Sequence, residues 1–173
     1  MLLLLVSSQR GQTMHKLDLK YMTIHRDKYI FQIPEHIKTS KPGKSNVSVV
    51  VNAFHPDHTV CPFSCLKEYI CRTQSLRGDA TRLFISFIKP HKPVSRDTLA
   101  RWTNITLKNS GIDTDVYTAH STRAASASKA NARQVPIDEI MAKAKWRLAE
   151  TFRKFYDKPI VENNNMAVAG LHK

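Results

Sequence analysis

The sequence predicts an α+β fold that is mainly α-helical, with a small antiparallel β-sheet near the N-terminus. Segments rich in β-branched and aromatic residues cluster in the early part of the chain. Helical spacing, capping residues and an alanine-rich segment dominate the rest. The length of 173 residues and the hydrophobic content of 42% indicate one domain with a real core and argue against general disorder.

The chain opens with MLLLLVSSQR, whose apolar run extends only from Leu2 to Val6. A membrane helix needs about 20 apolar residues, and a signal peptide needs a longer apolar region behind a basic flank. We therefore expect a protein that is neither secreted nor membrane-spanning. The run is interpreted as the last turns of a buried helix whose beginning is missing, which suggests a fragment of a longer protein.

Three strands are expected next. KYMTIHRDKYIFQIPEHIKT contains two β-rich runs on either side of His25-Arg26-Asp27, which is typical of a hairpin. SNVSVVVNAF supplies the third strand. Together they predict the small antiparallel sheet.

The first long helix is predicted in CPFSCLKEYICRT. Pro62 suits the first helical position, and Leu66, Tyr69 and Ile70 recur at helical spacing, so they form the expected core face. On this interpretation the helix also carries Cys65 inward. LFISFIKPHKPV, which follows, is a short apolar run and a proline-punctuated loop.

The remainder of the chain is predicted to be helical. SRDTLARWTNITLKNSG opens with a capping Ser95 and closes near Gly111. Three further helices are expected in AHSTRAASASKANA, IDEIMAKAKW and ETFRKFYD.

Basic side chains outnumber acidic ones in this chain. The 27 Lys and Arg residues stand against 14 Asp and Glu, for a formal net charge of +13. Such an excess favours a polyanionic partner, and nucleic acid is the usual one. A ribosomal or heparin-like basic surface, or simple solubility, is the alternative that charge alone leaves open.

The cysteines indicate that the protein works in a reducing compartment, and they do not predict a metal site. Cys61, Cys65 and Cys71 are an odd number and follow no signal peptide. His55 and His58 lie close to the first two along the chain, and His and Cys are zinc ligands. Their spacing is not that of a familiar zinc finger, and free Cys is usually a small buried hydrophobe. We expect no metal and no other cofactor.

His120 and Arg123 are the first candidate functional pair. They lie three residues apart at the predicted start of the alanine-rich helix, so they share a face. A helix N-terminus adds free N–H groups and the positive end of the helix dipole. The planar fork of Arg suits phosphate oxygens, and His exchanges protons near neutral pH. The pair suits a phosphate-activating site, although an isolated His-x-x-Arg is also common on protein surfaces.

The order of further residues gives this pair its context. Six candidates follow one another along the chain: Arg10, Lys38, His120, Arg123, Trp146 and Tyr156. The first lies in RGQT and the last in TFRKFY. This ordered set resembles the catalytic domain of tyrosine recombinases, the phage-integrase superfamily, and most closely the recombinases of DIRS-type and Crypton-type mobile elements.

The resemblance implies a domain organisation. It covers residues 1–159 as the catalytic domain, and it implies an integrase-like catalytic core that agrees with the elements predicted above. Family members carry an N-terminal helical domain that clasps the other side of the DNA, and we expect this core-binding domain to be absent here. Residues 160–173 correspond to the segment that docks on a neighbouring protomer, although a frayed tail is an equal alternative.

The resemblance also implies roles at the phosphate. Arg10 and Arg123 would clamp the scissile phosphate, and Tyr156 would be the nucleophile. The family often has an acidic residue three positions after the first arginine, where this chain has Thr13.

The remaining roles concern protons and packing. Lys38 would protonate the leaving 5′ oxygen, with Lys41 and Lys44 as alternatives in the same segment. His120 would assist proton transfer, and Trp146 would pack at the phosphate and donate a hydrogen bond through its indole N–H.

The sequence therefore leaves two alternative functions. The first is site-specific DNA recombination or integration, by strand breakage and rejoining through a 3′-phosphotyrosyl intermediate. The second is a truncated, catalytically silent DNA-binding remnant of a mobile-element recombinase. Either one predicts double-stranded DNA as partner and, for the enzyme, a homo-tetramer assembled only on DNA. The location would be the nucleus for a eukaryotic mobile element and the cytoplasm otherwise.

Overall fold

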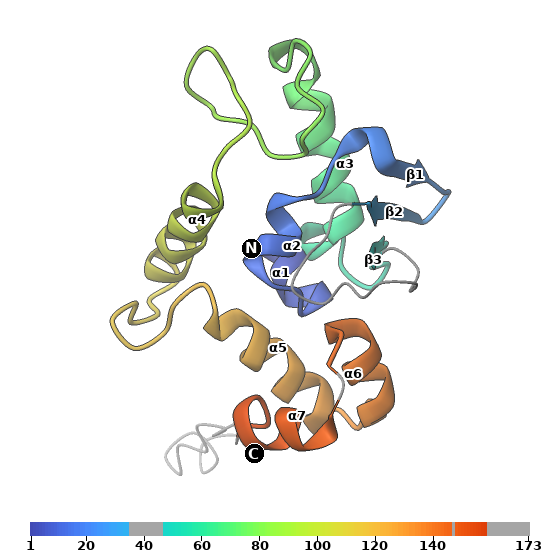
Figure 1. The fold of residues 1–173 in the computed structure, drawn as a ribbon, viewed down its shortest axis with the longest axis vertical. Helices are drawn as coiled ribbons and strands as arrows, with labels where there is room; N and C mark the ends of the chain where they lie inside the picture. Colours follow the sequence, from blue (N-terminus) through green and yellow to red (C-terminus); the bar gives the residue numbers. More distant parts are fainter. Residues whose placement is uncertain (35–46, 147, 159–173) are drawn as a thin grey trace, which may run out of the picture.

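The computed structural model describes residues 1–34, 47–146 and 148–158 (Figure 1). The described chain is rich in helix and contains a three-stranded antiparallel sheet in strand order β1-β2-β3, which confirms the predicted α+β class. The sheet packs with the first helices in one part of the molecule, and the last three helices form another (Figure 1).

Two short helices begin the chain. Helix α1 covers Leu2–Ser7, as the apolar run predicts, and ends at Ser8 in a left-handed conformation with φ 50°. Helix α2 covers Gly11–His15 directly afterwards. Sequence patterns do not predict α2, because five residues that begin with glycine carry no helical periodicity.

The predicted hairpin and third strand are confirmed. Strand β1 covers Met22–Ile24 and β2 covers Lys28–Ile33, so the connection contains residues 25–27. Strand β3 covers Val47–Asn52 and pairs antiparallel with β2, with Phe31 opposite Val49.

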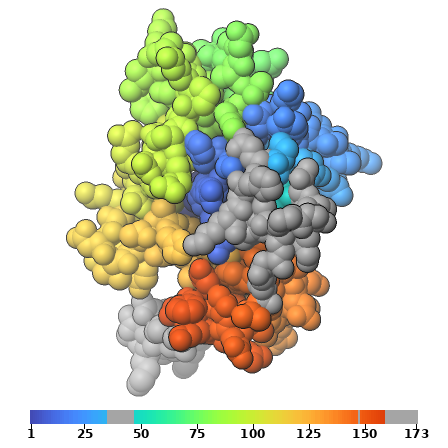
Figure 2. All heavy atoms as spheres, in the orientation of Figure 1, coloured from blue at the N-terminus to red at the C-terminus, as the bar shows by residue number. Residues whose placement is uncertain are grey.

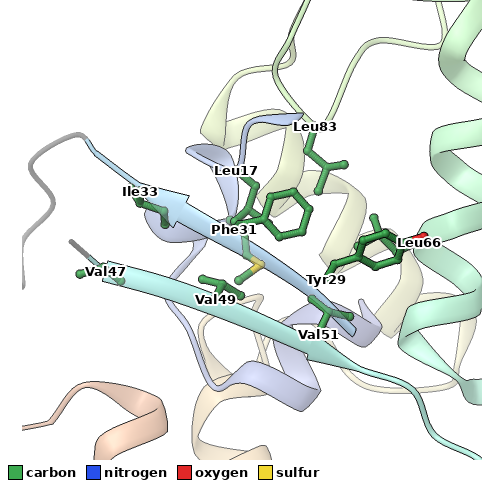
Figure 3. Close-up of a cluster of buried hydrophobic side chains, with 10 residues drawn as sticks. Leu17, Tyr29, Phe31, Ile33, Val47, Val49, Val51, Leu66 and Leu83 are labelled. Carbon is green, nitrogen blue, oxygen red and sulfur yellow. The ribbon is translucent and has the colours of Figure 1, made fainter. Parts of the chain in front are cut away.

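Alternation along these strands builds the first core. Every second residue of β2 and β3 points to the same face of the sheet, and on this face the residues are buried. Figure 3 shows them packed against side chains from three other segments; the labelled set is Leu17, Tyr29, Phe31, Ile33, Val47, Val49, Val51, Leu66 and Leu83.

Helix α3 covers Pro62–Thr73 and lies against β3. Its core face is the predicted one, with Leu66 buried and Tyr69 and Ile70 packed on the first core. The expectation that Cys65 points inward is wrong: Cys65 is exposed, and Cys61 is the buried thiol. Cys65 lies about 100° around the helix from Leu66, at the edge of the inward face.

Four helices follow α3 in the described part of the chain. Helix α4 covers Arg96–Asn109, α5 covers Ser121–Ala132, α6 covers Ile137–Ala144 and α7 covers Ala149–Phe155. Ser95 caps α4 as predicted, since its Oγ accepts a hydrogen bond from the Thr98 amide at 3.1 Å. Short 3₁₀ turns lie at Leu19–Tyr21, His58–Val60 and Gln74–Leu76.

Helices α5, α6 and α7 enclose a second core. Its buried members are Ala127, Ile140, Ala144, Trp146 and Phe152. Figure 2 shows α6 and α7, in orange to red, as one packed block at the lower end of the molecule. Helix α1 packs against α5 and so joins the two cores. Across the described residues, no helix is long and apolar enough to cross a membrane.

Candidate active site

Arg10 lies where the two cores meet. It precedes α2 with extended backbone angles, φ −80° and ψ 153°, and its carbonyl accepts hydrogen bonds from the amides of Thr13 and Met14. The residues just before it are tied to the C-terminal part. Gln9 Nε2 donates to the carbonyl of Lys143 at 2.5 Å, and the Ser8 hydroxyl is 2.7 Å from that of Ser126. The segment that leads into Arg10 is therefore held against α5 and α6.

Arg123 is the most unusual residue of the site. It lies in the first turn of α5, is only 1% exposed, and donates from Nη2 to the carbonyl of Ala144 at 2.6 Å. Its Nε and Nη1 are also buried but have no hydrogen-bond partner among the described residues. Since buried donors are normally paired, Arg123 has the capacity to bind an anion.

Arg77, the other buried arginine of the described chain, shows the contrast. Its guanidinium donates to the carbonyls of Arg82 and Leu83 and to the hydroxyl of Thr73. Arg77 is a structural residue whose guanidinium is largely satisfied by the protein, whereas two nitrogens of Arg123 lack such partners within the described ranges.

Two aromatic rings pack around the Arg123 guanidinium. Its Cζ lies 4.7 Å from the ring centroid of Trp146 and 5.5 Å from that of Tyr156. The centroids of the Trp146 and Tyr156 rings lie 4.3 Å apart. The indole Nε1 of Trp146 is buried and has no hydrogen-bond partner in the part of the chain that the structure describes. The site therefore holds three buried N–H-bearing nitrogens that a ligand oxygen can satisfy.

The charge at this site is destabilised in the absence of a ligand. Burial, and to a smaller extent the positive charge of Arg10, lower the pKa of the Arg123 guanidinium to about 10, and Tyr156 opposes the shift. The guanidinium is still protonated at neutral pH. An anion bound between Arg10 and Arg123 would offset both the burial and the mutual repulsion.

His120 lies at the exposed edge of the site. It is the N-cap residue of α5, and its ring centroid is 6.5 Å from that of Tyr156. The preceding turn is anchored to α4, because Asn104 Oδ1 accepts a hydrogen bond from the Ala119 amide at 2.7 Å. His120 and Arg10 both line a cavity of about 790 Å³ that is bounded by α1, α2, α3 and α4.

Tyr156 terminates the last helix. Helix α7 ends at Phe155, so Tyr156 and Asp157 lie just beyond it rather than inside the helix predicted from ETFRKFYD. The amides of both residues donate to the carbonyl of Phe152, at 2.8 and 2.9 Å. Phe152 is completely buried and anchors α7 in the second core.

The structure thus places five of the six sequence candidates in one region: Arg10, His120, Arg123, Trp146 and Tyr156. Lys38 and its alternatives Lys41 and Lys44 lie outside the described residues, and so does the segment 160–173. Among the described residues, no three His, Cys, Asp or Glu side chains gather into a group that could hold a metal ion.

Sequence reasoning missed the residues that support the site. Gln9, Ser126 and Ser128 connect the segments that carry the candidates. The available signal was the serine content of α5, because serine inside a helix often hydrogen-bonds to backbone groups. Nothing in the sequence indicates which carbonyl each side chain reaches.

Comparison with known proteins gives a likeness of fold. No family model matches the chain, and no curated protein matches it by sequence. Among solved structures, XerH site-specific recombinase bound to difH substrate has a TM-score of 0.66 at 16% identity, over 98% of this chain and 45% of that one.

Two further recombinases give the same result. XerA recombinase has a TM-score of 0.68 at 16% identity, over 98% of this chain and 55% of that one. A lambda integrase tetramer bound to a Holliday junction has a TM-score of 0.54 at 18% identity, over 95% of this chain and 44% of that one. This chain therefore spans about half the length of these proteins, and its fold is similar to that of integrase-type recombinase catalytic domains.

Proposed function

We propose that this chain is the catalytic part of a tyrosine recombinase, which breaks and rejoins DNA through a 3′-phosphotyrosyl intermediate. The observation that carries the proposal is the state of Arg123. It is buried, two of its nitrogens have no hydrogen-bond partner among the described residues, and it packs against the ring of Tyr156. A buried guanidinium beside a phenol is suited to binding a phosphodiester, because the phosphate oxygens would accept hydrogen bonds from its N–H groups.

Arg10 and Arg123 have the electrostatic role in this mechanism. A phosphodiester is anionic and repels an attacking oxygen, and the pentacoordinate transition state carries more negative charge than the ground state. Two fixed guanidinium groups offset this charge where it develops. The Trp146 indole N–H is a third buried donor, and it suits a phosphate oxygen.

Tyr156 supplies the nucleophile. Its phenolic oxygen forms a bond to phosphorus, and the bond from phosphorus to the 5′ oxygen breaks. The phenol loses its proton, and the leaving 5′ oxygen gains one. The covalent intermediate conserves the phosphodiester bond energy, so the reverse attack by a 5′ hydroxyl rejoins the strand without ATP.

Proton transfer is assigned to His120 and Lys38. The His120 ring lies on the exposed side of Tyr156, where it can exchange a proton with solvent or with the phosphate. We assign protonation of the leaving oxygen to Lys38 on the strength of the sequence resemblance. Exchange of Lys38, Lys41 and Lys44 for glutamine, one at a time, identifies the acid as the variant with the largest loss of cleavage rate.

The substrate proposed is double-stranded DNA, and the sequence motifs favour a mobile-element recombinase of the DIRS or Crypton type. XerH in complex with difH and lambda integrase on a Holliday junction are DNA complexes of similar fold. The formal charge of +13 suits the same partner.

The experiment that tests the function is a covalent trap. The full chain is incubated at low salt with a pool of nicked duplexes of varied sequence, in which cleavage beside the nick releases a short fragment and prevents rejoining. Denaturing electrophoresis should then show a protein–DNA adduct. Tyr156→Phe, which removes one oxygen and keeps the ring, should bind the same duplexes and form no adduct.

Two further results of this assay decide between mechanisms. A chelator should leave adduct formation unchanged, because the two arginines rather than a divalent ion stabilise the charge. If DNA is bound but no adduct forms under any condition, the DNA-binding remnant becomes the better description of the chain.

A further inference from the structure

Ser128 joins the helix of Arg123 to the backbone of Tyr156. It lies in α5, is 4% exposed, and its Oγ donates to the carbonyl of Tyr156 at 2.5 Å. The same oxygen accepts a hydrogen bond from the amide of Lys158 at 2.9 Å. One buried hydroxyl therefore holds the backbone on both sides of the Tyr156–Asp157 turn.

The end of α7 needs such a partner. The last carbonyls of a helix have no partner inside the helix, and glycine in a left-handed conformation usually closes the end by bonding back to them. Here Tyr156, Asp157 and Lys158 follow instead, and no glycine is available. A seven-residue helix is also marginal by itself. The amides of Tyr156 and Asp157 bond back to the Phe152 carbonyl, and Ser128 supplies the partner of the Tyr156 carbonyl from a neighbouring helix.

Helix α5 therefore contacts both the side chain and the backbone of Tyr156. Arg123 packs against the ring, with 5.5 Å between Cζ and the ring centroid, and Ser128 bonds the carbonyl. One turn further along α5, a second hydrogen bond reaches the same turn: Asn131 Nδ2 donates to Asp157 Oδ1 at 2.9 Å. Since Arg123 and Ser128 belong to one rigid helix, the position of the phenol relative to the guanidinium is set by α5.

We infer that Ser128 is a positioning residue for Tyr156, which fixes the phenol against the phosphate held by Arg123. This inference rests on the proposed function. Ser128 does not touch the reacting atoms, so its effect is on the geometry of attack and not on DNA affinity. Errors of about 1 Å in such geometry slow reactions by roughly a hundredfold.

The test compares the chemical step with DNA binding in Ser128→Ala. Under single-turnover conditions with DNA saturated by protein, the rate of adduct formation should fall by roughly ten- to a hundredfold. The Kd for the same duplex should stay within about twofold, because the phosphate contacts are unchanged. Ser128→Thr keeps the hydroxyl and should restore most of the rate.

Thr73→Val is the matched control. Its hydroxyl also donates to a carbonyl, that of Tyr69, and accepts from Arg77 Nη2, at 2.7 and 2.6 Å. It lies at the end of α3, in the other part of the molecule (Figure 1). The variant loses a comparable pair of hydrogen bonds, so it should lose stability comparably and keep the wild-type adduct rate.

A second readout does not depend on catalysis. Amide hydrogen exchange of Lys158 should be protected in the wild type and in Ser128→Thr, and faster by at least tenfold in Ser128→Ala, with the amides inside α5 unchanged. If Ser128→Ala fails to fold, Asn131→Ala gives a milder loosening of the same turn, with a rate loss of a few-fold.

The outcomes separate the inference from the proposed function. Loss of Lys158 protection with an unchanged adduct rate would overturn the positioning role and leave Tyr156 as nucleophile. Equal rate losses in Ser128→Ala and Thr73→Val would assign the effect to stability and overturn the role as well. Absence of any adduct in the wild type would overturn the proposed function, and the positioning role with it.

Discussion

At the scale of the residue, burial of the Arg123 charge lowers the stability of the folded protein. Arg123 is buried with one hydrogen bond to the Ala144 carbonyl, and its lowered pKa reports the loss of hydration. Replacing a buried, poorly paired charge by an apolar side chain of similar length often stabilises a protein. The proposed phosphate-binding role of Arg123 would explain why the chain keeps this charge.

This gives a prediction about stability. Arg123→Met should raise the free energy of unfolding by about 1–4 kcal/mol, while it removes adduct formation. Urea unfolding measures the change. Arg77→Met is the matched control and should lower the stability, because Arg77 loses bonds to two carbonyls and a hydroxyl. A destabilised Arg123→Met would instead assign Arg123 a structural role.

An anion bound at Arg123 should offset the free energy that is lost when this charge is buried. Vanadate or inorganic phosphate bound between Arg10 and Arg123 stabilises only the folded state, so the Tm should rise with the logarithm of the anion concentration once this exceeds the Kd. The wild type should show this rise and Arg123→Met should not. Equal rises in the two proteins would place the anion elsewhere on the basic surface.

At the scale of the element, Phe152 is the buried residue that anchors α7. Phe152 is fully buried in the second core, whereas Phe155 in the same helix is 56% exposed. Phe152→Ala should lower the free energy of unfolding by about 3–5 kcal/mol, and Phe155→Ala should change it by less than about 1 kcal/mol. Chemical denaturation of both variants measures the difference. Similar losses would show that α7 is not anchored through Phe152.

The elements also show what the sequence alone can predict. The hairpin, the third strand and the capped helix α4 follow from local signals: alternation, helical spacing and a serine cap. Helix α2 is too short to carry such a signal. The inward placement of Cys65 failed because the residue lies at the boundary of the apolar face, where spacing does not decide burial.

Prediction of the site was limited in a different way. The chain order of the candidates came from the resemblance, and the spacing of His120 and Arg123 placed them at one helix end, as observed. The buried state of Arg123 and its stacking on Trp146 are long-range contacts, which depend on how α5, α6 and α7 pack together. No local pattern encodes them.

At the scale of the whole molecule, charge should govern DNA binding. With a formal charge of +13, the chain should bind duplex DNA with little sequence preference. The logarithm of the association constant should fall linearly with the logarithm of the salt concentration, with a slope of about −0.9 for each phosphate contacted. Fluorescence anisotropy at several salt concentrations measures the slope. An affinity that stays flat from low to physiological salt would exclude backbone binding.

Assembly is predicted to depend on DNA. We expect the chain to be a monomer in dilute solution and to form a tetramer only on paired DNA sites, with residues 160–173 docking on a neighbour. Light scattering coupled to size exclusion, with and without duplex, measures the mass. Removal of residues 160–173 should abolish the tetramer and leave single-site binding intact. A stable tetramer without DNA would contradict the expectation.

The central claim is that the phenol of Tyr156 becomes bonded to DNA, and peptide mapping of the trapped adduct tests it most directly. Digestion with nuclease and trypsin, followed by mass spectrometry, should find the nucleotide remnant on the peptide of residues 155–173, at Tyr156. The same modification on the peptide of residues 109–123, at Tyr117, or on that of residues 68–72, at Tyr69, would contradict the claim.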